Sequence, residues 1–124
     1  MLIDRGDLSR EIRISSIPSV VLSILNTCKT NNTPCFVATN ILDSMIESKL
    51  PSRAEISDIY NLLSQGVSGF VLAAEMAIGK HPVESVQVLS YMKKLYDLER
   101  RSLMMTVYAH ELEPNLPSYL QNWL

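Results

Sequence analysis

Three groups of polar residues follow apolar runs in this sequence, and together they could bind an anion and a hard cation. They are Arg5-Gly6-Asp7, Thr39-Asn40 and Glu75. In parallel α/β folds, reactive side chains gather at the C-terminal ends of the strands. One or two carboxylates plus substrate oxygens are the ligands that Mg²⁺ prefers. Judged by spacing alone, a polar residue at the end of a strand more often caps a helix or forms an ion pair than binds a ligand.

The apolar runs before these groups predict the strands of a parallel sheet. Residues 1–3 are expected to be the end of a strand, followed by a polar turn over residues 4–9. Residues 35–39 and 69–74 are short, continuous apolar runs, which are typical of strands buried on both faces. Glu75 directly follows the last of these runs.

Helical spacing and capping signals predict the elements between the strands. Residues 18–29 carry apolar side chains on one helical face, and residues 41–46 suit one or two helical turns. Ser52 and Glu55 form a capping-box pattern at the start of a helix that Gly66 ends. Pro82 begins a long helix, the chain stays compatible with helix to about residue 112, and residues 118–124 suit a short terminal helix.

The expected order is strand, helix, strand, helix, strand, helix. This order predicts an α/β fold with parallel strands and right-handed crossover helices. We expect residues 1–101 to form this unit and residues 102–124 to form a C-terminal helical extension.

Composition excludes several classes of function. The 124 residues include 11 basic and 13 acidic side chains, so no basic surface argues for nucleic acid. The apolar runs are too short to span a membrane, and charge begins too early for a signal peptide. Cys28 and Cys35 show no metal-binding spacing, so we expect two buried, reduced thiols in a cytosolic protein.

Four blocks of residues give a more specific signal than spacing. Residues 5–8 read Arg-Gly-Asp-Leu, residues 37–45 read Val-Ala-Thr-Asn-Ile-Leu-Asp-Ser-Met, residues 51–58 read Pro-Ser-Arg-Ala-Glu-Ile-Ser-Asp, and residues 72–76 read Leu-Ala-Ala-Glu-Met. In this order and spacing they resemble pyruvate kinase over about residues 1 to 100. The resemblance implies a partial (β/α)₈ TIM-type barrel, from the end of the sixth strand to the eighth helix.

The resemblance also implies substrate-binding and metal-binding residues. Asp7 matches a metal ligand, and the backbone amides of Gly6 and Asp7 match groups that hold the substrate carboxylate. Arg5 matches the arginine of the same loop. Arg53 matches an arginine that opens the next helix and helps to bind the substrate-side loops.

Two catalytic residues are implied in the same way. Thr39 matches a threonine that contacts substrate near the carbon that is protonated, and Glu75 matches a glutamate near the proton relay and the monovalent cation. The family has serine, glycine and threonine around this glutamate, whereas this chain has Ala73, Ala74 and Met76. The loss of two hydroxyls bears on the proton relay and on the true substrate.

The implied function is phosphoryl transfer between phosphoenolpyruvate and ADP, a glycolytic reaction, with Mg²⁺ (or Mn²⁺) and K⁺. The catalytic lysine and the second metal carboxylate of the family belong to an earlier strand that this sequence does not contain. We therefore expect no activity from this chain alone. The alternatives are a degenerate barrel remnant that acts as a binding or regulatory module, and a carbon–carbon lyase that works on pyruvate enolate.

A sheet of only about three barrel strands would have open edges and an uncovered inner face. We expect self-association first, a cover formed by residues 108–124 second, and a separate chain that supplies the missing strands third. The expected partner is therefore a second copy of this chain or a separate chain that completes the barrel.

Overall fold

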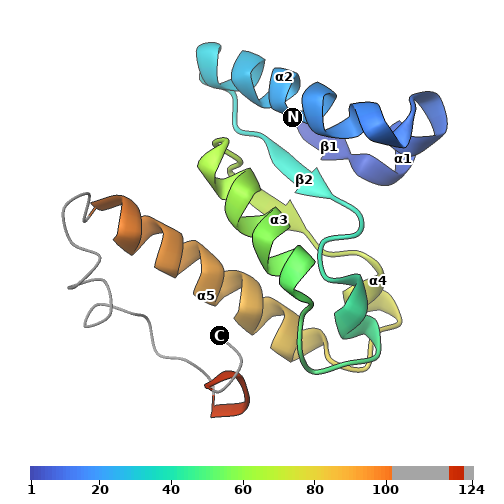
Figure 1. Cartoon of the computed structure of the whole chain (residues 1–124), viewed down its shortest axis with the longest axis vertical. Helices are drawn as coiled ribbons and strands as arrows, with labels where there is room; N and C mark the ends of the chain where they lie inside the picture. Colours follow the sequence, from blue (N-terminus) through green and yellow to red (C-terminus); the bar gives the residue numbers. More distant parts are fainter. Residues whose placement is uncertain (102–117, 122–124) are drawn as a thin grey trace.

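A computed structural model describes residues 1–101 and 118–121 of the chain (Figure 1). The elements, in chain order, are β1 Leu2–Asp4, α1 Arg5–Glu11, the 3₁₀ helix η1 Ile14–Ser16, α2 Ile17–Thr30, β2 Phe36–Ala38, the 3₁₀ helix η2 Asp43–Ile46, α3 Arg53–Ser64, β3 Gly69–Val71, α4 Ala74–Ala77, α5 Pro82–Arg101 and the 3₁₀ helix η3 Ser118–Leu120. Within these residues no helix is long and apolar enough to cross a membrane.

The strands of the described ranges form one parallel three-stranded sheet in the order β1-β2-β3. Ile3 pairs with Val37, which pairs with Phe70. The predicted strands and their parallel arrangement are confirmed, although β3 is shorter than the apolar run that predicted it. The strand ends early because Ala73, the N-cap of α4, leaves the extended conformation.

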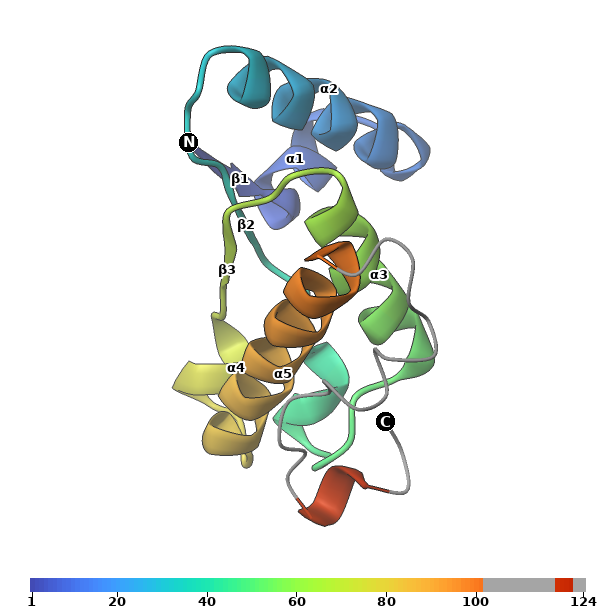
Figure 2. The ribbon, with the colours of Figure 1, turned by 90° about the vertical axis from the view of Figure 1, so that its left-hand side faces the viewer.

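The helices cover one face of this sheet. Figure 2 shows the strands along one side of the molecule, with α2, α3 and α5 all on the other side of them. Ile3 and Val37 point toward the helices and are buried. On the opposite face, Leu2, Phe36 and Val71 are 55, 41 and 41 % exposed. The described chain therefore leaves the second face of its sheet uncovered.

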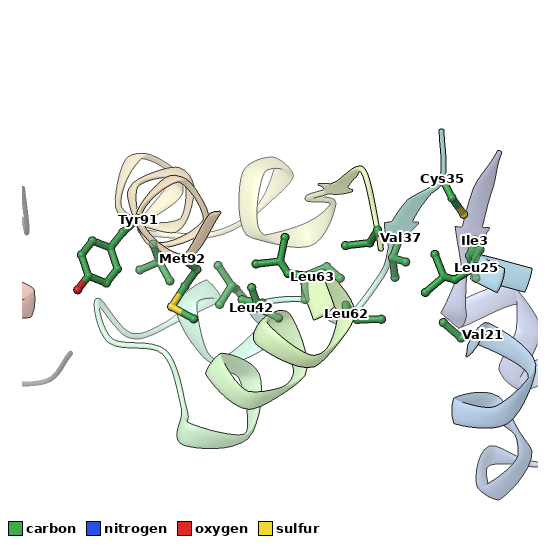
Figure 3. Packing of buried hydrophobic residues seen from close by; sticks show 14 of the residues in the cluster. Ile3, Val21, Leu25, Cys35, Val37, Leu42, Leu62, Leu63, Tyr91 and Met92 are labelled. Atoms are coloured by element: carbon green, nitrogen blue, oxygen red, sulfur yellow. The ribbon is translucent and has the colours of Figure 1, made fainter. Parts of the chain in front are cut away.

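Apolar side chains from the sheet and the helices form one core cluster (Figure 3). Val21 and Leu25 of α2 pack with Ile3, and Ile59 and Leu62 of α3 belong to the same cluster. Cys28 and Cys35 are buried, free thiols within it, as predicted. Burial, with a smaller contribution from the neighbouring Cys28 thiol, raises the pKa of the Cys35 thiol to about 11.

The helix starts follow the sequence signals. Ser52 accepts from the Glu55 amide, and the Glu55 carboxylate accepts from the Ser52 amide, so the predicted capping box is present. Gly66 follows the helix with a φ of 94°, a left-handed conformation that suits glycine. Pro82 begins α5, as predicted.

The predicted turn over residues 4–9 is wrong, because α1 occupies most of it. Asp4 is the N-cap of this helix, and its carboxylate accepts hydrogen bonds from the amides of Gly6 and Asp7. A capping aspartate satisfies N–H groups that would otherwise have no partner in the first turn.

Most of the expected C-terminal extension, residues 102–117 and 122–124, lies outside the described residues. Of the rest, η3 forms part of the short terminal helix predicted there. The Tyr119 hydroxyl donates to the Glu84 carbonyl at 3.2 Å, and Leu120 is buried in the core cluster. Residues 118–121 thus lie against the first turn of α5, whereas the uncovered face of the sheet is elsewhere (Figure 2).

Candidate functional site

The C-terminal ends of β1 and β2 meet through Asp4 and Thr39. The Thr39 hydroxyl donates to Oδ1 of Asp4 at 2.5 Å. The same oxygen accepts from the amides of Gly6 at 2.9 Å and Asp7 at 3.2 Å. These bonds hold the pKa of the Asp4 carboxyl below its usual value, with the Thr39 hydroxyl as the largest cause. The structure thus brings the predicted residues Gly6, Asp7 and Thr39 together around one carboxylate oxygen.

Arg5 fixes the loop that follows β2. Its Nη1 binds both carboxylate oxygens of Asp58 on α3, at 3.0 and 2.8 Å. Its Nη2 donates to the carbonyl oxygens of Thr39 at 3.2 Å and Asn40 at 3.0 Å. Thr39 and Asn40 have φ angles of 74° and 56°, which few non-glycine residues adopt. Arg5 therefore positions Thr39 by holding a loop that is otherwise unfavourable.

Gly6 permits the close approach between α1 and this loop. A Cβ atom at Gly6 would lie 2.8 Å from Cγ2 of Thr39. No real side chain fits at that distance without a shift of the Thr39 side chain. The glycine thus lets Thr39 lie directly against the start of α1.

Glu75 is buried beneath the loop that joins β2 to η2. Its Oε1 accepts from the Leu42 amide, and its Oε2 accepts from the Ala73 amide, both at 2.9 Å. The side chain is 1 % exposed. Glu75 thus ties the end of β3 to the segment after β2, and each of its carboxylate oxygens holds one backbone N–H group.

The Asp43 carboxylate lies near the carboxylates of both Glu75 and Glu55. Glu55 accepts from the amide of Ser44 at 2.8 Å and from its hydroxyl at 2.5 Å. Burial raises the pKa of the Asp43 carboxyl, and the charges of Glu75 and Glu55 raise it further. Glu75 and Glu55 thus both bond to the start of the 3₁₀ helix η2, at Leu42 and Ser44.

Asp7 and Arg53 are the most accessible of the predicted site residues. The Asp7 side chain is 72 % exposed and lies 3.6 Å from Nη1 of Arg10. Arg53 begins α3 and is exposed. The described residues contain no group of three His, Cys, Asp or Glu side chains that could enclose a metal ion. One exposed carboxylate fits the partial coordination by which proteins hold Mg²⁺ together with substrate oxygens and water.

Sequence reasoning missed Asp4, which organises the site. The signal was present, because aspartate is among the preferred N-cap residues. It was overlooked because the segment was predicted to be a turn, so no helix was expected to begin there.

Comparison with known proteins agrees with this fold. The family model for the barrel domain of pyruvate kinase matches residues 1–86. Pyruvate kinase of Thermotoga maritima is 45 % identical over 94 residues, which cover 76 % of this chain and 20 % of that protein. Pyruvate kinase of Borreliella burgdorferi is 37 % identical over 112 residues, which cover 90 % of this chain and 23 % of that protein.

Solved structures of the same family have similar folds. A pyruvate kinase from Cryptosporidium parvum has a TM-score of 0.72 and 27 % identity over 94 % of this chain and 24 % of that chain. The pyruvate kinase of Pyrobaculum aerophilum has a TM-score of 0.71 and 38 % identity over 74 % of this chain and 22 % of that chain.

The fold is that of a parallel α/β protein. The chain belongs to the pyruvate kinase family. It spans about a fifth of the length of the curated relatives that it matches.

Proposed function

We propose that this chain supplies the C-terminal part of the (β/α)₈ barrel of a cytoplasmic, pyruvate-kinase-type phosphotransferase. In this proposal β1, β2 and β3 are the sixth, seventh and eighth barrel strands. The reaction is phosphoryl transfer between phosphoenolpyruvate and ADP, with Mg²⁺ and K⁺. The observation that carries the proposal is the convergence of Gly6, Asp7 and Thr39 on one carboxylate oxygen.

The donors around Asp4 suit the carboxylate of an enol phosphate substrate. Two amides and a hydroxyl already bind a carboxylate oxygen here, that of Asp4. A substrate carboxylate would take the place of Oδ1, and the Asp4 side chain would turn away. Thr39 then contacts the substrate, and Arg5 acts as a positioning residue, since it holds the Thr39 and Asn40 carbonyls.

Asp7 is the residue that would hold the divalent cation. When bound, Mg²⁺ neutralises the charge that develops on the phosphate and carboxylate oxygens. The Asp7 carboxylate is free to leave the long, exposed ion pair with Arg10, which contributes little at the surface. Glu75, the other predicted catalytic residue, supports the site by holding the Leu42 and Ala73 amides.

Catalysis requires a completed barrel, because the family's lysine and second metal carboxylate come from an earlier strand. We therefore expect no turnover by the chain alone in an assay that couples pyruvate formation to lactate dehydrogenase. Turnover near the usual kinase range of about 1–100 per second by the isolated chain would contradict this expectation.

A binding or regulatory module is the second candidate function. Asp4 already satisfies the donors predicted for substrate, and Ala73 and Met76 stand where the family has hydroxyls. Assay of the chain in complex with the other barrel strands separates the two candidates. Turnover that falls in Thr39→Val supports the transferase. A complex that binds phosphoenolpyruvate without turnover supports the module.

A further inference from the structure

We propose that Cys28 and Cys35 form a redox-active pair, and that the pocket beside Cys28 admits a small anionic disulfide that oxidises them. The structure shows both thiols in their free, reduced form. The pair lies at the opposite end of β2 from Thr39, so this proposal does not depend on the proposed function.

A short turn brings the two cysteines together. Cys28 lies in the last turn of α2, and Cys35 directly precedes β2 (Figure 3). Between them the chain reverses through Asn32, which has a φ of 51°, and the Thr33 amide donates to the Cys28 carbonyl at 2.8 Å. The Cys35 amide donates to the Ser68 hydroxyl at 3.0 Å, and the Cys35 carbonyl accepts from the Ser68 amide at 2.7 Å. The backbones of both cysteines are thus fixed.

The two thiol groups contact each other inside the core. Their side chains are hydrogen-bonded, and both belong to the one core cluster. Cys28 is 5 % exposed and Cys35 is 1 % exposed. Sulfur atoms in such contact need small side-chain rotations to form a disulfide. A disulfide here would tie the end of α2 to the start of β2.

The two thiols differ in access. Cys28 lines a pocket with a volume of about 450 Å³, whereas Cys35 is not part of its lining. Small-molecule sites in proteins have volumes of about 300–1,000 Å³. The other walls come from the turn after α2, the end of α3, and Tyr96 and Arg100 of α5. A small molecule that enters this pocket therefore meets Cys28 first.

The pocket carries positive charge in an acidic chain. Lys29 and Arg100 line it, and no acidic side chain of the described residues does. The chain as a whole has a formal net charge of −2, so the two cations form a local exception. A pocket of one sign of charge raises the local concentration of ligands of the other sign. A disulfide that bears carboxylates is thus the class of oxidant that this pocket suits.

The first step joins the reagent to Cys28. Cys28 loses its proton, its sulfur attacks one sulfur of the entering disulfide, and a bond forms between the two. The reagent's own S–S bond breaks, and its second half leaves as a thiolate that takes up a proton. Cys28 then carries one half of the reagent as a mixed disulfide.

The second step joins the two cysteines. Cys35 loses its proton and attacks Sγ of Cys28, and the remaining half of the reagent leaves as a thiol. In total, two cysteines are oxidised to one disulfide, and one small disulfide is reduced to two thiols. Burial and the Cys28 thiol raise the pKa of the Cys35 thiol to about 11, so its thiolate is scarce. We therefore expect the mixed disulfide to accumulate before Cys35 resolves it.

The test treats the reduced, full chain at pH 8 with oxidised glutathione, an anionic peptide disulfide, and follows the intact mass without reductant. We expect one glutathione to add first and then to leave, while the chain loses two hydrogen atoms. Cys35→Ser should keep the glutathione, because the resolving thiol is gone. Cys28→Ser should react about tenfold more slowly, because its remaining thiol does not line the pocket.

Peptide mapping of the parent gives the same answer without any substitution. The early adduct should map to Cys28, and the final disulfide should join Cys28 to Cys35. Circular dichroism of each variant checks that the chain still folds.

Charge variants test the pocket. Lys29→Ala and Arg100→Ala should each slow the reaction with oxidised glutathione about threefold or more, and about 1 M salt should shrink this difference. Neutral hydroxyethyl disulfide should react with both variants within about twofold of the parent rate, because it has no net charge to attract. Lys94→Ala is the matched control, since Lys94 is an exposed cation of α5 that does not line the pocket. It should leave both rates within about twofold of the parent.

Four results would overturn the proposal. Oxidised glutathione reacts with the chain in denaturant alone, or the early adduct maps to Cys35. In the third, the parent keeps its glutathione as Cys35→Ser does. In the fourth, Lys94→Ala slows the reaction as much as Lys29→Ala and Arg100→Ala, which means that the pocket does not select the reagent.

Discussion

The Thr39 hydroxyl donates to Oδ1 of Asp4 at 2.5 Å and so joins the ends of two neighbouring strands. The same oxygen accepts the Gly6 and Asp7 amides, so one carboxylate caps α1 and orders the predicted substrate loop. Any carboxylate ligand must compete with this internal group.

Asp4→Asn should lower the midpoint of thermal unfolding at neutral pH. Asparagine can still cap the helix, but it cannot supply the charge that the three donors favour. The pKa of Asp4 is lowered from 3.8 in the folded chain, so its carboxylate stabilises the fold above that pH. This contribution is lost as pH falls through the lower, folded-state pKa. Calorimetry from pH 7 to pH 2 should show the difference between parent and variant shrinking with acid. A constant difference would mean that the charge has no role.

Asp58→Asn should destabilise the chain by about 1–3 kcal/mol, since it removes half of a partly buried ion pair. The Arg5 and Asp58 side chains are 17 and 35 % exposed, and Arg5 also holds the Thr39 and Asn40 carbonyls. Urea unfolding measures the change. Asp97→Asn is the control, because its pair with Lys93 is more exposed and should be worth about 0.5 kcal/mol or less. Equal effects of the two variants would rule out a special role for Arg5.

Glu75→Gln should cost about 1–3 kcal/mol, because the side-chain amide turns a donor toward a backbone N–H group that needs an acceptor. The buried carboxylate now accepts from both Leu42 and Ala73. Guanidinium unfolding compares this variant with Glu47→Gln, whose carboxylate is 71 % exposed in its pair with Lys80. An unchanged midpoint in Glu75→Gln would show that the two backbone bonds are dispensable.

Much of the fold follows from the sequence, and the exceptions have physical causes. The strands, the Ser52 capping box and the Pro82 helix start are local patterns, so they could be predicted. The contact of Asp4 with Thr39 joins residues 35 positions apart and depends on the register of β1 on β2. Local spacing cannot show this register, so the contact between Asp4 and Thr39 could not be predicted, although the capping role of Asp4 has a local signal.

The structure brings some of the predicted site residues together, while their roles in binding or catalysis stay predictions. Gly6, Asp7 and Thr39 do gather at the strand ends. The partner of Arg5, Asp58, lies on α3, and the bond depends on how that helix packs. The burial of Glu75 depends on the segment after β2 folding over it. These are tertiary contacts without a local signal.

Mn²⁺ should bind the isolated chain weakly, and Asp7→Ala should remove most of that binding. A single exposed carboxylate holds a hard cation poorly when no substrate oxygen helps. Titration calorimetry of the parent and the variant measures this, with Glu11→Ala as a control on the same helix. If Asp7→Ala leaves the heat unchanged, the cation binds elsewhere.

Cys35 should react slowly with a thiol reagent in the folded chain. Its pKa is raised from 9.0 to about 11, so the thiolate fraction at pH 8 falls about a hundredfold. Alkylation followed by mass spectrometry, with and without denaturant, measures the rate. Cys28→Ser checks that the signal comes from Cys35. Fast labelling without denaturant would mean that this part of the core opens readily.

The position of β1 has a consequence for the order in which the chain folds during synthesis. The hydrogen-bonding partners of residues 2–4 are residues 36–38, which leave the ribosome more than thirty residues later. α2 lies between them and can form from local contacts alone, whereas closing the loop around it carries an entropic cost. We therefore expect β1 to be ordered late, after the helix that separates it from β2.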